Sequence, residues 1–347
     1  MTYSIVELEC IDKNDWIAYV TSNENGSFFH TPTFLDAIET QIGYKAIALC
    51  AINESGEIEA LLTGYQQVVK QGLLSALSIR IVVPQLPLYN DERSLAALLQ
   101  AFTARIGKNA VYSEFRAQVP DQVFRKVAQG VGMSYVPHYN VINDCSDVEE
   151  SSKIISESKR RQIKKALKSG VTIEESPSLA QVHAYYDILH YLYINKVQKP
   201  LVTRSYFEYL YNNNKGNDDF CTKFLLVIFE DKVIGGIVAP VSEKKTIHEH
   251  YVAGLDQEYK NQYPSVMATW AAIDYASRNE IACFDFMGAG IPDEDYGVRD
   301  FKLKFGGELI EAGRYEYVPK RLKYTIATKG FELYRKLQHF RSKIRNI

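Results

Sequence analysis

An order of secondary-structure signals that occurs twice is the feature that most constrains how this chain folds. In each half, helical signals come first, and an antiparallel β-meander, a helix and a closing strand follow. The first meander turns at NESGE, residues 53–57, and the second turns at Glu230 and Asp231. This repetition predicts two structurally related domains of the mixed α/β (α+β) class, at residues 1–150 and 151–318.

Four further segments have patterns that each predict one element. SYVPHYNVIND (134–144) reads as the strand that closes the first half, and TIHEHYVAGL (246–255) as one strand of the second meander. SVMATWAAIDYASRN (265–279) has the pattern of a helix, and ACFDFMG (282–288) that of the strand after it. The second half therefore ends as strand, helix and strand.

Length and composition limit the class of protein. A chain of 347 residues is long for one core and suits two domains of about 150 to 175 residues. An apolar content of 46% and a charged content of 24% are typical of a soluble globular protein and exclude disorder or collagen as the main theme. The net charge of −2 argues against a grip on nucleic acid by the whole surface, so any such grip is local.

The cysteines and the apolar runs predict a cytoplasmic protein. The five cysteines are scattered, odd in number and without CxxC spacing, so we expect reduced thiols and no metal site. The N-terminus lacks the basic start and apolar core of a signal peptide. FLLVIF (224–229) is among the longest apolar runs and falls far short of the ~20 residues that span a bilayer, so no transmembrane segment is expected.

The strand–helix–strand order at the end of each half resembles the N-acetyltransferase (GNAT) fold of acyl-CoA N-acyltransferases. In that fold the helix normally opens with a glycine-rich turn whose amides hold the pyrophosphate of coenzyme A. Here Tyr263, Pro264 and Ser265 occupy the turn, and the matching helix of the first half opens at Asp91 and Glu92, which would repel phosphate. We therefore expect two tandem GNAT-like domains, with mixed, mostly antiparallel sheets flanked by helices, and a weakened grip on coenzyme A.

Five motifs spread over nearly the whole chain support a narrower resemblance: FFHTPTFLDAI (28–38), SKRRQIKKALKSGV (158–171), YVAGLDQEYKNQYPSVMATWAAIDYA (251–276), FDFMGAG (284–290) and FKLKFGGE (301–308). Together they resemble the FemA/FemB/FemX (FemAB-like) family. The resemblance implies transfer of an amino acid from aminoacyl-tRNA to an amine of a peptidoglycan precursor, without a tightly bound cofactor. Two alternatives remain open. One is an acyl-CoA-dependent N-acyltransferase acting on an amino sugar or another amine of surface-polysaccharide synthesis, and the other is a non-catalytic module that binds such a precursor.

The main catalytic candidates lie in FDFMGAGIPDEDYGVRDFKLKFGGE, residues 284–308. Lys302 and Lys304 alternate with apolar residues, so on a strand both ammonium groups would project to one face and suit an oxyanion. The resemblance places Phe301 and Lys302 beside the acyl-transfer channel. Asp285 ends the fifth strand, where it could orient or deprotonate an amine. A solvated lysine face and a carboxylate that satisfies turn amides are the alternatives.

The substrate-binding candidates come from three other segments. Gly288 and Gly290 suit close backbone approach or positive φ. Tyr251 matches a tyrosine that the family places in the substrate cleft. Arg204, with Tyr206, stands where the family has an arginine that holds the anionic precursor, and a helix-cap salt bridge is the alternative.

A basic helix and a basic tail could meet anionic partners. Arg160, Arg161, Lys164 and Lys165 belong to the helix that opens the second half, where they could bind tRNA or phosphate or form a solvated face. The tail, residues 319–347, is amphipathic and predicts a helix that packs back onto the first domain. A peripheral membrane contact of the tail is the weaker interpretation.

Two features depart from simple patterns. Several family enzymes carry an aspartate-proline pair on a strand of the first domain, and here Glu114 or Arg116 stands in its place. His248 and His250 have a spacing that could ligate a metal, but the sequence offers no carboxylate or cysteine to complete the set, so ordinary half-buried histidines are favoured. The sequence leaves the donor and the general base open.

Overall fold

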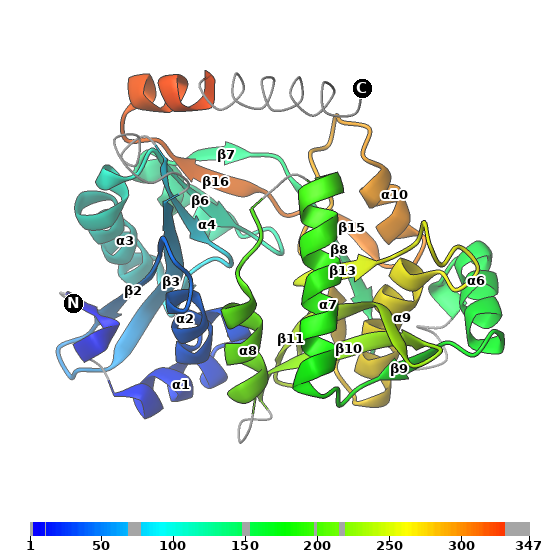
Figure 1. The fold of residues 1–347 in the computed structure, drawn as a ribbon. Coiled ribbons are helices and arrows are strands. Elements are labelled where there is room, and N and C mark those ends of the chain that lie inside the picture. Colours follow the sequence, from blue (N-terminus) through cyan, green and yellow to red (C-terminus); the bar gives the residue numbers. More distant parts are fainter. Residues whose placement is uncertain are drawn as a thin grey trace.

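The structure, a computed structural model, describes most of the chain: residues 3–10, 12–68, 78–147, 153–197, 200–214 and 219–329. These residues form two mixed sheets with helices packed on both faces of each (Figure 1). The fold is the predicted mixed α/β class, with one sheet mainly from each half of the chain.

The first sheet has the order β1–β2–β3–β4–β6–β16–β7, with β5 paired to β3. Only the β4–β6 pair is parallel among the described pairs of this sheet. The predicted turn at NESGE joins β2 to β3. The strands are β1 (Ser4–Glu7), β2 (Tyr44–Ile52), β3 (Ile58–Val68), β4 (Ile79–Val83), β5 (Leu88–Tyr89), β6 (Tyr112–Arg116), β7 (Ser134–Val136) and β16 (Arg314–Tyr317).

The second sheet has the order β15–β8–β14–β12–β11–β10–β9, with β13 paired to β11. The β12–β14 pair is parallel, and the other described pairs are antiparallel. Both sheets thus combine an antiparallel meander with one parallel pair. The strands are β8 (Tyr139–Asp144), β9 (Thr172–Glu174), β10 (Phe220–Phe229), β11 (Lys232–Ser242), β12 (Thr246–His248), β13 (Tyr251–Gly254), β14 (Cys283–Asp285) and β15 (Glu308–Glu311).

Each sheet receives a strand from the other half of the chain. β8 lies between β14 and β15 in the second sheet, and β16 lies between β6 and β7 in the first. The prediction of one strand over residues 134–144 is therefore wrong. Pro137 separates β7 from β8, because proline has no N–H to donate to a ladder. The division at residue 150 stays a proposal, since the sheets interlock on both sides of it.

The helices form three apolar layers with the sheets. α3 (Glu92–Ala101) and α4 (Gln122–Gly130) cover the outer face of the first sheet, and α6 (Glu157–Lys168) and α9 (Pro264–Arg278) cover that of the second. The remaining layer, here called the middle core, fills the space between the sheets (Figure 1). It is built on α1 (Lys13–Ser22), α2 (Pro32–Glu39), α7 (Leu179–Leu192) and α8 (Arg204–Asn212).

Local sequence chemistry explains where the helices of the middle core begin. Thr31 caps α2 by accepting a hydrogen bond from the Phe34 amide, and Pro32 stands at the first helical position. Ser178 and Gln181 form a capping box at the start of α7. The Thr31 cap is buried, whereas the Ser178 capping box lies at the exposed end of its helix.

The predicted C-terminal helix is described only in part. Residues 321–329 are helical, and the Tyr324 ring lies 5.7 Å from the Tyr112 ring of β6. The described turns of the tail therefore contact the first sheet. Residues 330–347 lie outside the described residues.

Candidate functional site

The site lies between β12 and β13, at the point where the chain leaves its partner strand β14. β12 follows β14 as far as His248, which pairs with Asp285, and the Glu249 amide donates to the Asp285 carbonyl at 2.8 Å. The next amide, of His250, turns away and donates to Val238 on β11 at 3.2 Å. The prediction of one strand over residues 246–255 is therefore wrong, because a bulge at 249–250 divides it into β12 and β13.

A group of buried polar side chains, here called the polar cluster, fills this separation. Each member is 9% exposed or less, although carboxylates and lysines are seldom buried without partners. Its members come from three strand ends and one helix: Asn140, His248, Glu249, Asp285 and Lys302.

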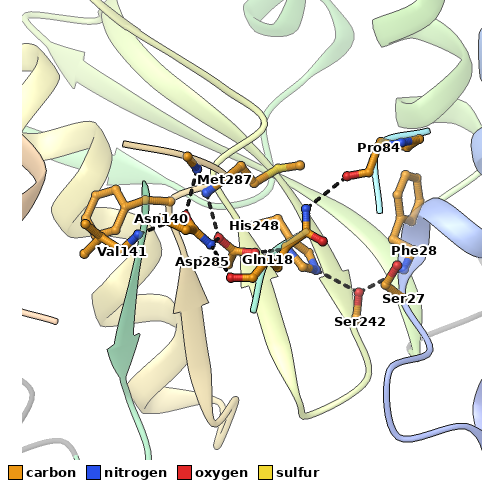
Figure 2. Close-up of polar contacts among 12 residues, drawn as sticks. Ser27, Phe28, Pro84, Gln118, Asn140, Val141, Ser242, His248, Asp285 and Met287 are labelled. Carbon is orange, nitrogen blue, oxygen red and sulfur yellow. Dashed lines mark hydrogen bonds and ion pairs between the residues drawn. The ribbon is translucent and has the colours of Figure 1, made fainter. Parts of the chain in front are cut away.

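Asp285 is held on both carboxylate oxygens (Figure 2). Oδ1 accepts hydrogen bonds from Asn140 Nδ2 at 2.8 Å and from the Met287 amide at 2.7 Å. Oδ2 lies 3.5 Å from His248 Nδ1. Asp285 therefore satisfies a turn amide, as one sequence interpretation expected, and its role in orienting or deprotonating an amine stays a prediction.

His248 connects Asp285 to the first half of the chain (Figure 2). Its Nε2 lies 3.0 Å from Ser242 Oγ, and Ser242 Oγ accepts a hydrogen bond from the Phe28 amide at 2.9 Å. Since Ser242 accepts from Phe28, its own hydroxyl proton is free to point to His248 Nε2. Nδ1, the other ring nitrogen of His248, faces Asp285 Oδ2 at 3.5 Å, a distance longer than that of an ordinary hydrogen bond.

Lys302 and Glu249 form a buried ion pair. Lys302 Nζ lies 2.8 Å from Glu249 Oε1 and also donates to the carbonyls of Phe286 at 2.7 Å and Gly288 at 2.9 Å. Burial raises the pKa of Glu249, and the ammonium of Lys302 opposes that rise. Lys302 therefore fixes the backbone that follows β14.

The predicted strand at FKLKFGG is wrong. Helix α10 (Gly297–Leu303) ends in this segment, so Lys302 is buried while Lys304 is exposed, and the two lysines do not share a face. Phe301 and Phe305 lie one helical turn apart with ring centroids 5.2 Å from each other, which an alternating strand would not allow. The alternation of charged and apolar residues in this segment therefore does not mark a strand; it includes one lysine, Lys302, that is paired inside the protein.

The predicted glycines take backbone conformations that favour glycine. Gly288 has φ of 121° and Gly290 has φ of 83°, and the preceding Met287 is also left-handed at 54°. The Gly288 amide donates to Asn140 Oδ1 at 2.7 Å. The chain after Asp285 is thus a tight turn held by the polar cluster.

Tyr206 and Tyr251 line the other side of the bulge. Tyr206 is buried, and its hydroxyl lies 2.9 Å from His250 Nε2. The Tyr251 ring, which is half-buried, lies 6.4 Å from the Tyr206 ring. Burial, together with His248 and Arg116, lowers the pKa of His250 to about 3, so the imidazole is neutral.

The remaining predicted residues lie on the surface. Arg204, the first residue of α8, pairs with Asp187 of α7, so it forms a salt bridge between two helices and not within a helix cap. The four predicted basic residues of α6 are exposed: Arg160, Arg161, Lys164 and Lys165. Of these, Arg161 pairs with Glu157, and Lys165 donates to Asn261 at 2.8 Å.

The start of α9 is occupied by a side chain. Asp256 accepts from the Ser265 amide at 3.0 Å and from the Ser265 hydroxyl at 2.5 Å. Pro264 removes a further amide donor, and Tyr263 stands before it at φ of 50°. Since a carboxylate already takes the place where a pyrophosphate would bind, this helix end is a poor grip for coenzyme A.

Sequence reasoning missed three members of the polar cluster. Asn140 and Glu249 were not named, and His248 was weighed as a metal ligand or an ordinary half-buried histidine but not as a partner of Asp285. The signal for Glu249 was an acid between two histidines on a strand.

Among the described residues, no group of three or more His, Cys, Asp or Glu side chains is placed to hold a metal ion. None of the described helices has the length and apolarity to cross a membrane.

One segment of the chain matches a family model, and solved structures share the fold. Residues 234–329 match the model of the FemAB family. The crystal structure of FemX is 14% identical, with a TM-score of 0.69 over 93% of this chain and 100% of that one. The structure of L-PGS from Bacillus licheniformis is 13% identical, with a TM-score of 0.58 over 92% and 96%.

A third solved structure is a tandem GNAT protein from the clavulanic acid biosynthesis pathway. It is 10% identical, with a TM-score of 0.55 over 92% of this chain and 99% of that one. No curated protein matches the sequence. These likenesses confirm the tandem GNAT-like fold.

Proposed function

We propose that this chain, a FemAB-like acyltransferase, forms an amide bond on the amine of a cell-wall precursor with aminoacyl-tRNA as the donor. The FemAB match over residues 234–329 covers β13, α9, β14 and α10, which hold or support much of the site. The likeness in fold to FemX and to L-PGS supports the same class of transfer.

The observation that carries the choice of donor is the start of α9. Asp256 holds the Ser265 amide and hydroxyl there, so an anionic pyrophosphate would meet a carboxylate. An aminoacyl-tRNA donor does not need that grip, because its acyl group arrives on a ribose ester. This favours aminoacyl-tRNA over acyl-coenzyme A.

The geometry suggests how the transfer proceeds. The acceptor amine attacks the ester carbonyl of the donor, an N–C bond forms, and the C–O bond to the tRNA ribose breaks. A base takes the amine proton and passes it to the departing ribose oxygen, which leaves as a hydroxyl. We assign Asp285, supported by His248, to hold or accept that proton. Lys302 positions the turn at Gly288 by donating to its carbonyl, and its role in stabilising the oxyanion stays a prediction.

A reconstituted transfer reaction tests this function. The full chain is incubated with mixed aminoacyl-tRNAs and a UDP-linked muramyl pentapeptide, and in parallel with acetyl-coenzyme A and glucosamine. We expect mass spectrometry to show one added aminoacyl residue only in the first reaction. Consumption of acetyl-coenzyme A alone would establish the N-acyltransferase alternative, and no turnover of either donor would favour a binding module.

A matched pair of variants tests the assignment of Asp285. Asp285→Asn should lower kcat by roughly 100-fold or more, as loss of a proton acceptor does. Asp293→Asn changes an exposed acid in the loop after β14 and should leave the rate unchanged. Equal rates in the two variants would remove Asp285 from the mechanism.

A further inference from the structure

One face of the first sheet is polar where a core would be expected. On β6, Phe115 points into the outer core under α3 and α4, so Tyr112, Glu114 and Arg116 point to the opposite face, toward the space between the sheets. On the neighbouring strands Arg80 and Arg314 share that face, since Ile81 and Tyr315 lie in the outer core. The middle core covers only part of this face, and the polar residues lie beyond it.

The strand register places Arg116 and Arg314 side by side, with Arg80 farther along the same face. Arg314 pairs with Arg116, and Arg80 pairs with Tyr112, two residues before Glu114. Glu114 bridges two of them: its Oε1 lies 2.6 Å from Arg116 Nε, and its Oε2 lies 3.1 Å from Arg314 Nη1. Burial alone would raise the pKa of Glu114, but Arg116 and Arg314 lower it to about 2, so it is ionised.

Charge and donors remain in excess after this pairing. Glu316 shares the face, yet three arginines still exceed two glutamates. Arg80 donates from Nε to Gln67 Oε1 at 2.6 Å, which neutralises nothing. Among the described residues, each arginine uses one nitrogen in these contacts, and the side chains of Arg116 and Arg314 are 35% and 26% exposed. Guanidinium groups placed in this way are ready for a second oxyanion.

The arginines lie next to the site. Asn140 of the polar cluster donates from Nδ2 to the carbonyl of Gln118, two residues after Arg116, at 3.1 Å. The amide of Gly313, the residue before Arg314, donates to the His138 carbonyl at 2.9 Å. His138 also lies beside the turn after Asp285, since a methyl group added to Gly288 would lie 3.6 Å from His138 Nε2. The strand ends that carry Arg116 and Arg314 are therefore hydrogen-bonded to the segment that borders the proposed reaction centre.

We propose that Arg80, Arg116 and Arg314 bind an oxyanion of the acceptor, a carboxylate or a phosphate, and so hold its amine toward Asp285. Only the statement that the anion belongs to the acceptor rests on the proposed function; the anion site itself does not. Guanidinium groups recognise an anion at this face, and the ring of Tyr112, which lies on the same face, supplies an apolar surface beside them.

Direct titration tests the anion site without turnover. Calorimetry on the full chain measures the binding of inorganic pyrophosphate and, separately, of succinate, and the probe that binds identifies the oxyanion as phosphate or carboxylate. Arg116→Gln and Arg314→Gln should each weaken that probe by about tenfold to hundredfold, as loss of a charged hydrogen bond does. Arg93→Gln, an exposed arginine at the start of α3, is the control and should bind as the parent chain does.

Several outcomes would overturn the proposal: neither probe binds, the two variants bind as the parent chain does, or Arg93→Gln loses as much affinity. Arg80→Gln, which leaves the Glu114 pairs intact, replaces either variant whose melting curve shows loss of folding. If transfer is active, the same variants should raise KM for the acceptor with kcat little changed. Anion binding without transfer would refute the proposed function and leave the anion site standing.

Discussion

Removal of the Lys302 ammonium should cost this protein a large part of its stability. In Lys302→Met, a side chain of similar length stays in place, but Glu249, whose side chain is 6% exposed, loses its counter-ion. The carbonyls of Phe286 and Gly288 lose a donor at the same time. Breaking a buried pair by removing one partner costs about 3–5 kcal/mol, against a total of about 5–15 kcal/mol for a folded domain.

A double-mutant cycle separates this structural role from a purely chemical one. The free energy of unfolding is measured by urea denaturation for Lys302→Met, Glu249→Gln and the double variant. We expect the double variant to be more stable than the sum of the single losses by about 2 kcal/mol or more, because no buried charge remains unpaired. Lys304→Met, which changes the exposed lysine two residues later, should stay within about 0.5 kcal/mol of the parent chain.

The pH dependence of the Lys302→Met variant adds an independent check. Without the ammonium, burial should raise the pKa of Glu249 further, so the folded state binds a proton that the unfolded state releases. The stability lost in this variant should therefore be smaller at pH 5 than at pH 8. A loss below about 1 kcal/mol, equal to that of Lys304→Met, would refute the reasoning that the pair is buried and structural.

Three further outcomes are expected. Burial, as the main cause, lowers the pKa of His30 to about 4 and that of His250 to about 3, so the unfolded state binds more protons below pH 6.5, and the melting temperature should fall between pH 7 and pH 5. A flat profile would contradict this. Gly254→Ala should cost about 1–3 kcal/mol, since its Cβ would lie 2.4 Å from the first-turn amide of α9, whereas Gly130→Ala meets nothing within 4 Å and should not destabilise. Ser242→Ala should lower the free energy of unfolding by about 1–3 kcal/mol, because it leaves the buried amide of Phe28 unpaired. An unchanged urea midpoint would show that the hydrogen bond between Phe28 and Ser242 does not stabilise the fold.

Local sequence chemistry determined much of the fold. The turn at NESGE, the cap at Thr31 and the capping box at Ser178 act within a few residues, so the hairpin and the helix starts follow from the residues themselves. The repeated order of these elements predicted the tandem GNAT-like fold, which the FemX likeness confirms. The same local reasoning identified Tyr263, Pro264 and Ser265 as a poor grip for coenzyme A, and the structure adds Asp256 to them.

The candidate site depends on contacts that no local pattern contains. Sequence reasoning found Asp285 and Lys302, but it placed Lys302 on a strand beside Lys304, because alternation fits a strand and equally fits a short helix with one buried lysine. The partner of Lys302 is Glu249, more than fifty positions earlier in the chain. Only the tertiary structure brings that pair into one low-dielectric space, where a charge must find a partner.

The distance along the chain between two interacting groups separates what the sequence determined from what only the tertiary structure decided. Hydrogen bonds within a turn or a cap are decided by neighbours in sequence, so the sequence by itself determined the elements and their order. The exchange of β8 and β16 between the sheets and the burial of Asp285 against His248 join distant segments. Buried polar groups of distant segments must find partners when the interior packs and loses water. These contacts therefore depend on the whole fold, and only the tertiary structure decided which segments pair.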